Sequence, residues 1–282
     1  MIRIAVASGK GGTGKTTVAT SLALLLARRQ SVHFLDCDVE APNGALFLKP
    51  VIEVTEQVTR LVPVIDEFVC NHCGDCSAFC RFNALATTAR SVLVFPELCR
   101  DCGGCALVCP KGAISETPRS VGQVAEGLAG AIRFTHGTLN TGEIATVHLI
   151  QAVRRRESAV DVVIVDSPPG TGCPVVAAVE GIDWVVLVTE PTPFGLHDLS
   201  LAVEMTRSLG LRAAVVVNRD GMGDDRVDRF CASAAIPIIG RIADDRRVAE
   251  AYSRGDLPLT SLPSFCGEIE AIAGHLTAEA LV

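Results

Sequence analysis

Residues 2–17 read Ile-Arg-Ile-Ala-Val-Ala-Ser-Gly-Lys-Gly-Gly-Thr-Gly-Lys-Thr-Thr. An apolar run of strand character leads into a glycine-rich loop, and that loop opens an amphipathic helical segment over 16–29. Residues 9–16 satisfy the P-loop pattern, in which backbone N–H groups and the positive end of the following helix bind phosphate oxygens. The stretch therefore predicts a nucleotide site, with Lys15 at the β- and γ-phosphates and Thr16 on Mg²⁺.

Further short runs rich in Val and Ile suit strands that are covered on both faces. These runs are 32–36, 160–166, 184–189, 213–218 and 236–240. Segments long enough for helices or larger insertions separate them, so the pattern predicts an α/β fold with a doubly wound, mostly parallel sheet. We expect the functional loops at the carboxyl ends of these strands, where such folds bind ligands.

Two cysteine runs with the same x₂, x₂, x₃ spacing lie near the front of the chain. This spacing is that of ferredoxins with two [4Fe–4S] clusters, where the fourth cysteine of each run binds the other run's cluster. We therefore assign cluster 1 to Cys70, Cys73, Cys76 and Cys109, and cluster 2 to Cys99, Cys102, Cys105 and Cys80. Zinc sites or a disulfide framework are the alternatives, but neither needs the doubled spacing.

The interval between Asp38 and Val160 is too long for an ordinary crossover between strands. Segments of β character at 58–68 and 113–125 flank the cysteine runs, and residues 84–95 predict a small hairpin between them. We expect a small α+β domain of the bacterial ferredoxin type, inserted into a P-loop domain. The expected segments are the first part of the P-loop domain (1–63), the insert (64–115) and the second part (116–282).

Composition narrows the class of function. The 282 residues are 49% hydrophobic and 20% charged, which allows a large core without disulfides. Twelve cysteines with no signal sequence before the first strand favour a reducing cytoplasm. The net charge of −7 argues against coating nucleic acid, and no apolar run approaches the roughly twenty residues of a membrane span. We expect a cytoplasmic protein with no nucleic-acid or membrane partner.

Four motifs together are similar to those of the MinD/ParA ATPases, which have a deviant Walker A loop. They are 10–17, with the extra lysine Lys10 early in the loop, 34–38 after the second strand, 162–172 and 215–219. With the cysteine insert, the chain most resembles members of this superfamily that carry an inserted ferredoxin domain. Mrp-type iron–sulfur carriers and the nitrogenase iron protein are related to them. The resemblance implies a P-loop NTPase fold and ATP hydrolysis.

The resemblance also implies a role for each residue of the nucleotide site. Lys10, Lys15 and Asp38 would be catalytic: Lys10 would reach a partner's phosphates across a dimer interface, and Asp38 would orient the attacking water. Mg²⁺ would be held, directly or through water, by Thr16, Asp36 and Asp166. The nucleotide would contact Gly11, Gly12, Thr13, Gly14, Lys15, Thr16, Thr17, Gly170 and Asn218, with Thr17 at the α-phosphate and Asn218 at adenine.

Ordinary structural roles are the alternatives for several of these residues. Lys10 could be a solvated surface lysine, and Asp36 or Asp38 a helix-capping residue. Cys173, in the 166–173 segment that would sense ATP against ADP, is either a contact to a metal or partner or, by the interpretation favoured here, a small buried hydrophobe. Ordinary packing is expected for Cys37, Cys231 and Cys266.

Three hypotheses about function follow. The first is an ATPase whose nucleotide state is coupled to electron transfer through two [4Fe–4S] clusters. The second is a metallocluster assembly or carrier ATPase like the Mrp-type proteins, although their C-terminal cysteine pair is absent here. The third and weakest is a MinD-like spatial organiser, because 264–282 predicts a helix without Lys or Arg to bind a membrane.

The expected cofactors are the two clusters, ATP and Mg²⁺. The expected partners are a second subunit, in an ATP-dependent homodimer or a heterodimer with a paralogue, and a redox or metallocluster acceptor that the sequence does not identify.

Overall fold

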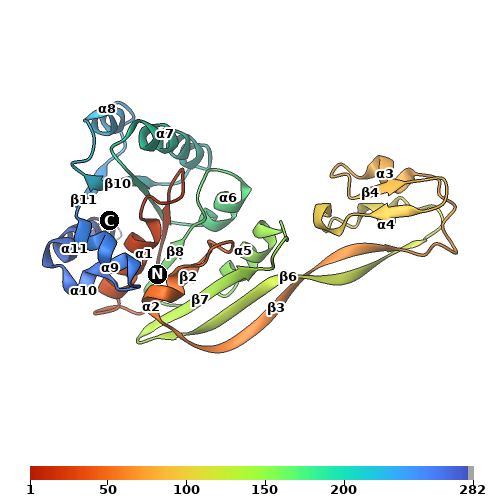
Figure 1. Ribbon diagram of the computed structural model, residues 1–282, viewed down its shortest axis with the longest axis horizontal. Helices are drawn as coiled ribbons and strands as arrows, with labels where there is room; N and C mark the ends of the chain where they lie inside the picture. The colour runs from red at the N-terminus through yellow and green to blue at the C-terminus, as the bar shows by residue number, and fades with distance from the viewer. Residues whose placement is uncertain (279–282) are drawn as a thin grey trace.

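A nine-stranded sheet runs through the computed structural model, which describes residues 1–278 (Figure 1). Its order is β11-β10-β9-β1-β8-β2-β7-β6-β3, and every pair from β11 to β7 is parallel. The parallel strands are β1 (Ile2–Ala7), β2 (Val32–Asp36), β7 (Ile132–Leu139), β8 (Val162–Asp166), β9 (Trp184–Thr189), β10 (Ala213–Asp220) and β11 (Ile238–Ala243). The predicted mostly parallel α/β fold is confirmed.

Helices cover both faces of the sheet because alternate residues of each strand point to opposite faces. On one face, Ile4 and Ile164 pack against α1 (Lys15–Leu26), α2 (Gly44–Leu48), α9 (Arg246–Ser253), α10 (Pro258–Ser261) and α11 (Pro263–Ala278). On the other face, Ala5 and Val165 pack against α5 (Thr146–Arg154), α6 (Cys173–Val179), α7 (Pro193–Ser208) and α8 (Arg226–Ser233).

Helix α1 differs from the amphipathic helix that the sequence predicts. It is buried along most of its length, because α11 lies against it in addition to the sheet. The helix predicted over 264–282 is observed as α11, and its last residues lie outside the described part of the chain. Within residues 1–278, none of the helices has the length and apolar character needed to cross a bilayer.

Strand β7 is absent from the sequence-based prediction. Arg133, Thr135 and His136 interrupt its apolar pattern, so the segment does not read as a buried strand. In the fold, Phe134 stacks on Phe34 of β2 with 5.8 Å between the ring centroids, and this packing places β7 beside the parallel strands. Tertiary packing therefore decides the identity of this strand.

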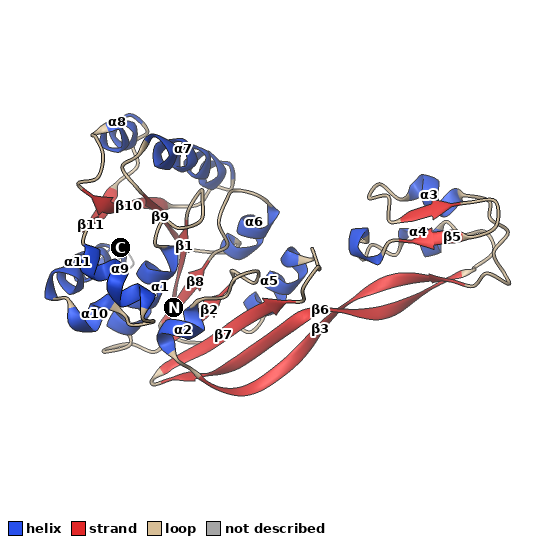
Figure 2. Ribbon diagram, viewed as in Figure 1, coloured by secondary structure: helices blue, strands red, loops and turns tan. Residues whose placement is uncertain are grey.

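A two-stranded antiparallel ribbon extends from the edge of the sheet (Figure 2). Strand β3 (Val51–Ile65) pairs with β6 (Ile114–Ala129) from Val51 opposite Leu128 to Ile65 opposite Ile114. The pairing runs through the boundaries predicted at 63/64 and 115/116. The ribbon therefore belongs both to the main sheet and to the unit at its far end.

The unit at the end of the ribbon comprises residues 66–113, which hold both cysteine runs (Figure 1). It contains α3 (Asp75–Phe79), β4 (Leu85–Thr87), β5 (Val92–Val94), the 3₁₀ turn η1 (Pro96–Leu98) and α4 (Gly104–Leu107). β4 and β5 form the hairpin expected between the runs. Its small core joins Leu85 and Val92 to Ile65 and Ile114 from the ribbon, together with cysteine side chains.

Candidate nucleotide site and cysteine sites

The glycine-rich loop connects β1 to α1 at the carboxyl edge of the sheet. Gly14 precedes α1 with a left-handed φ of 93°, and a Cβ there would lie 2.3 Å from Asn218 Nδ2. Asn218, on β10, donates from Nδ2 to the carbonyl of Thr13 at 2.7 Å. Lys15 is buried at the start of α1. The loop thus has the conformation of a phosphate site, with the predicted Asn218 against it.

Two buried carboxylates lie beside the loop, at the ends of β2 and β8. Thr16 donates from Oγ1 to Asp166 Oδ2 at 2.6 Å, and the amide of Gly44 donates to Asp36 Oδ2 at 2.8 Å. Both aspartates are fully buried, and Asp166 Oδ1 has no hydrogen-bond partner. Three of the predicted Mg²⁺ residues, Thr16, Asp36 and Asp166, therefore lie together.

The electrostatics of this pair suit a cation. Burial raises the pKa of Asp166 to about 7, against the hydrogen bond from Thr16 and the charge of Lys15. Burial, and next the charge of Asp166, raise the pKa of Asp36 well above its ordinary range. A divalent cation would favour the ionised forms and occupy the unpartnered oxygen, so these residues fit Mg²⁺.

Asp38 lies two residues beyond Asp36 and is only partly buried. Its amide donates to Asp36 Oδ1 at 3.2 Å, so the turn that holds Asp36 also positions Asp38. Burial raises the pKa of Asp38, while the charge of Lys15 lowers it. The charge of Lys15 therefore acts on the carboxylate for which the resemblance implies water orientation.

Glu190 is a residue of this region that the sequence analysis missed. It follows β9 and receives Lys10 Nζ at 3.1 Å on one oxygen and Arg219 Nη1 at 2.9 Å on the other. Lys10 is therefore paired within its own chain, with 33% of its side chain exposed. The one available signal was the position of Glu190, at the carboxyl end of a predicted strand.

The loop after β8 contacts the glycine-rich loop through its backbone. The Gly170 amide donates to the Ser8 carbonyl at 2.9 Å, and Gly170 has a left-handed φ of 97°. The favoured interpretation of Cys173 is wrong: this side chain is exposed, because it lies at the first position of α6 and outside the core. Cys37 and Cys231 are buried as expected, whereas Cys266 is half-buried.

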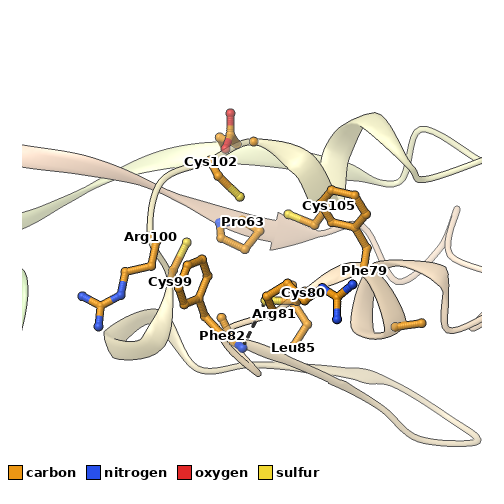
Figure 3. Close-up of a pocket in the computed structure, with 14 residues that line it drawn as sticks. Pro63, Phe79, Cys80, Arg81, Phe82, Leu85, Cys99, Arg100, Cys102 and Cys105 are labelled. Carbon is orange, nitrogen blue, oxygen red and sulfur yellow. Dashed lines mark hydrogen bonds between the residues drawn. The ribbon is translucent and has the colours of Figure 1, made fainter.

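The eight cysteines of the two runs divide into two groups, each around its own cavity. Cys80, Cys99, Cys102 and Cys105 line a cavity of about 320 Å³, and Figure 3 shows Cys99, Cys102 and Cys105 directing their sulfur atoms toward one space. The other group lines a tight cavity of about 10 Å³ and comprises Cys70, Cys73, Cys76 and Cys109. Each group takes three cysteines from one run and the fourth from the other.

Backbone geometry repeats in the two runs. Gly74 and Gly103, both with positive φ, open the short helices that carry the third cysteine of each run. The fourth cysteines, Cys80 and Cys109, each accept a hydrogen bond on Sγ from the amide four residues later, at 3.3 Å in both cases. Such N–H···S bonds favour a thiolate over a neutral thiol. No disulfide joins cysteines in the described part of the chain.

Comparison with known proteins shows to which family the chain belongs. Residues 4–259 match the CobQ/CobB/MinD/ParA nucleotide binding domain. The chain belongs to this family. The match includes the glycine-rich loop, both buried aspartates and Asn218, so the P-loop part of the predicted resemblance is confirmed. The inserted ferredoxin domain and its clusters stay predictions.

Some proteins similar to this chain have no stated function in their names, and others are named for a function. Uncharacterized protein MJ0578 of Methanocaldococcus jannaschii is 34% identical over 230 residues, which are 79% of this chain and 80% of that protein. The iron-sulfur cluster carrier protein of Pyrococcus horikoshii is 24% identical over 272 residues, which are 90% of this chain and 77% of that protein.

Solved structures show the same fold. The septum site-determining protein MinD complexed with Mg-ADP, from Pyrococcus horikoshii, superposes with a TM-score of 0.62. The two chains are 18% identical, and the alignment covers 99% of this chain and 97% of the other. At this identity the likeness concerns the fold alone.

The nucleotide site generates a prediction about two of its residues. Lys15→Ala is expected to weaken ATP binding roughly 10- to 100-fold, because a buried charge-assisted contact to phosphate is lost. Asp38→Ala is expected to keep ATP binding but to lower turnover about 100-fold, because only water placement is removed. Binding is measured by calorimetry and turnover by phosphate release. Glu204→Ala, which removes an exposed carboxylate on α7, is the control, and normal turnover by Asp38→Ala would contradict the role of Asp38.

Proposed function

We propose that this chain is an ATPase that binds two [4Fe–4S] clusters on an inserted ferredoxin-type domain at 64–115, between P-loop segments 1–63 and 116–282. The observation that carries the proposal is the division of eight cysteines into two groups of four, attached by a ribbon to a P-loop domain. Four thiolates are the usual ligand set of one such cluster. Cluster 1 would bind to Cys70, Cys73, Cys76 and Cys109, and cluster 2 to Cys80, Cys99, Cys102 and Cys105.

The donor chemistry supports iron–sulfur clusters over zinc. The amide hydrogen bonds to Cys80 and Cys109 are of the kind that stabilise cluster ligands, and each group draws one cysteine from the opposite run, as two-cluster ferredoxins do. The cavity of cluster 2 is open, whereas the thiols of cluster 1 would have to separate to admit a cube. A bound cluster supplies a one-electron redox centre or a unit of iron and sulfide for transfer.

Cluster assembly and delivery is the role that we favour. Several relatives that align with 90% or more of the chain, among them those of Pyrococcus horikoshii and Rickettsia typhi, are named iron-sulfur cluster carrier proteins. In this role the clusters are cargo, and nucleotide binding controls when the cysteines release them to an acceptor protein.

Electron transfer is the second candidate, and one observation favours it. Each group has a complete set of four cysteines, so every cluster iron has a protein ligand and no position is left for an acceptor. In this role the clusters are resident, and nucleotide binding controls the docking of a redox partner.

Hydrolysis would be carried out by Lys15, Asp38 and, from a second subunit, Lys10. Thr16, Asp36 and Asp166 would hold Mg²⁺, and the rest of the nucleotide would contact residues 11–17, Gly170 and Asn218. Because Glu190 holds Lys10 within its own chain, this salt bridge has to break before Lys10 reaches a partner's phosphates.

The first test of the proposal is metal content. Protein purified without oxygen is expected to contain about eight iron and eight sulfide atoms per chain. Cys80→Ser is expected to impair cluster 2, and Cys109→Ser cluster 1, although each lies in the sequence run of the other cluster. Cys173→Ser removes an exposed cysteine outside both groups and should keep the full content. Zinc, or about four irons in the unmodified protein, would contradict the assignment.

The second test separates delivery from electron transfer. Loaded protein is incubated with an iron chelator and either Mg-ATP or Mg-ADP, and the cluster absorbance is followed over time. Delivery predicts that ATP accelerates iron loss severalfold, because nucleotide binding opens the cysteine groups. Retention of both clusters at equal rates in the two nucleotides would leave electron transfer as the function. At a nucleotide concentration that saturates only the unmodified protein, Lys15→Ala should show no nucleotide effect in either case.

The third test concerns the dimer. A non-hydrolysable ATP analogue is expected to raise the mass measured by sedimentation from that of one chain to that of two, while ADP does not. Lys10→Ala should lose this response, and Glu190→Gln should strengthen it, because Lys10 is then released. A mass of one chain for every variant in the ATP analogue would refute the dimer.

A further inference from the structure

Arg60, on the ribbon strand β3, lies buried against the loop that carries Cys99. Its Nη1 donates to the carbonyl of Cys99, and its Nη2 donates to the carbonyl of Pro96 at 2.9 Å. Only 2% of the side chain is exposed. A planar guanidinium with several donors can fix two carbonyls of one loop at once, which a single-headed lysine does poorly. Arg60 therefore sets the backbone position of one cysteine of the cluster 2 group.

The charge of Arg60 is balanced by a residue from the main body. Glu143 accepts from Arg60 Nη2 at 2.8 Å and has 3% of its side chain exposed. Arg119 of β6, directly opposite Arg60 across the ribbon, approaches the other Glu143 oxygen at 3.4 Å. Two arginines facing each other would repel, and Glu143 offsets this repulsion by pairing with both, while Glu97 pairs with Arg119 at 2.9 Å.

Glu143 lies in the connection between β7 and α5, three residues before α5 begins. Helix α5 contacts the ribbon near its first turn and α6 at its other end. His148 is hydrogen-bonded to the carbonyl of Thr59, next to Arg60, at 3.0 Å. At its other end, Arg154 donates to the carbonyls of Ala178 and Glu180, at 3.1 and 2.9 Å. These carbonyls lie at the end of α6, which directly follows the loop after Asp166.

We propose that Arg60 is a positioning residue for the cluster 2 site and that its ion pair with Glu143 transmits the position of α5 to that cluster. The inference rests on the proposed binding of two clusters, in either of the two roles. The structural chain is short. The loop after β8 continues into α6, which lies beside α5 (Figure 1) and accepts hydrogen bonds from its Arg154, and the connection before α5 places Glu143 against Arg60. Cluster 1 has no such contact with the main body among the described residues.

The test is a redox titration of the loaded, full-length protein, followed by paramagnetic resonance. Arg60→Met removes a buried positive charge and is expected to lower the potential of cluster 2. Glu143→Gln removes the compensating negative charge and is expected to raise it. Cluster 2 is identified as the signal lost in Cys102→Ser. Opposite shifts of cluster 2, with the potential of cluster 1 unchanged, are what the proposal requires, since a general loosening of the ribbon would not give opposite signs.

Two controls keep the result interpretable. Arg156→Met breaks an ion pair between the main body and Glu56 of β3, at an exposed position of the ribbon, and should leave both potentials unchanged. Arg60→Lys keeps the charge but cannot fix both carbonyls, so it should restore only part of the potential lost in Arg60→Met. If Arg60→Met does not fold, the role of the Arg60–Glu143 ion pair is judged from the cluster 2 potentials of Glu143→Gln and Arg60→Lys.

Nucleotide dependence completes the test. In the unmodified protein, the potential of cluster 2 should differ between the ATP analogue and ADP, and Glu143→Gln should reduce this difference. Shifts of both clusters together, or no shift in any variant, would overturn the proposal while leaving cluster binding intact. Absence of any cluster signal from the unmodified protein would instead overturn the proposed function itself.

Discussion

Backbone pairing between β3 and β6 is the interaction on which the architecture depends. The pairing starts within the main sheet and continues without a change of partner to the base of the cysteine unit. Because hydrogen bonds of a two-stranded ribbon need support from side chains, the free part of the ribbon has to be stabilised locally. Arg60, Glu143 and Arg119 supply such support at the point where the ribbon passes from the main body to the cysteine unit.

The nucleotide site shows a different balance of forces. Asp36 and Asp166 are buried together near Lys15. Burial opposes the ionisation of both carboxyls, and the charge of Asp166 further opposes that of Asp36. Such an arrangement is costly unless a cation and phosphates complete it. Two buried carboxyls with raised pKa values therefore indicate a functional site. A sheet edge that served only stability would carry apolar residues at these positions.

The proposed nucleotide site and the proposed cluster sites require different mobility of the chain that joins them. A phosphate-sensing loop has to move with its ligand, whereas cysteine groups require a fixed geometry. Helix α5 connects the two regions, because it is hydrogen-bonded through Arg154 to α6 and through His148 to β3. Glu143, in the connection that leads into α5, forms an ion pair with Arg60 in which both side chains are buried.

The sequence by itself determined the strands that consist of continuous apolar runs, such as β1 and β2, because burial on both faces leaves a one-dimensional signal. It also predicted which cysteines come together, since the doubled spacing is that of two-cluster ferredoxins, in which the fourth cysteine of each run joins the other group. Only the tertiary structure decided that β7 is a strand, because Phe134 gains its partner Phe34 from far along the chain. The exposure of Cys173 and the pairing of Arg60 with Glu143 were likewise decided only by the tertiary structure. Each depends on which surfaces contact each other after folding, and the spacing of residues in the sequence does not predict those contacts.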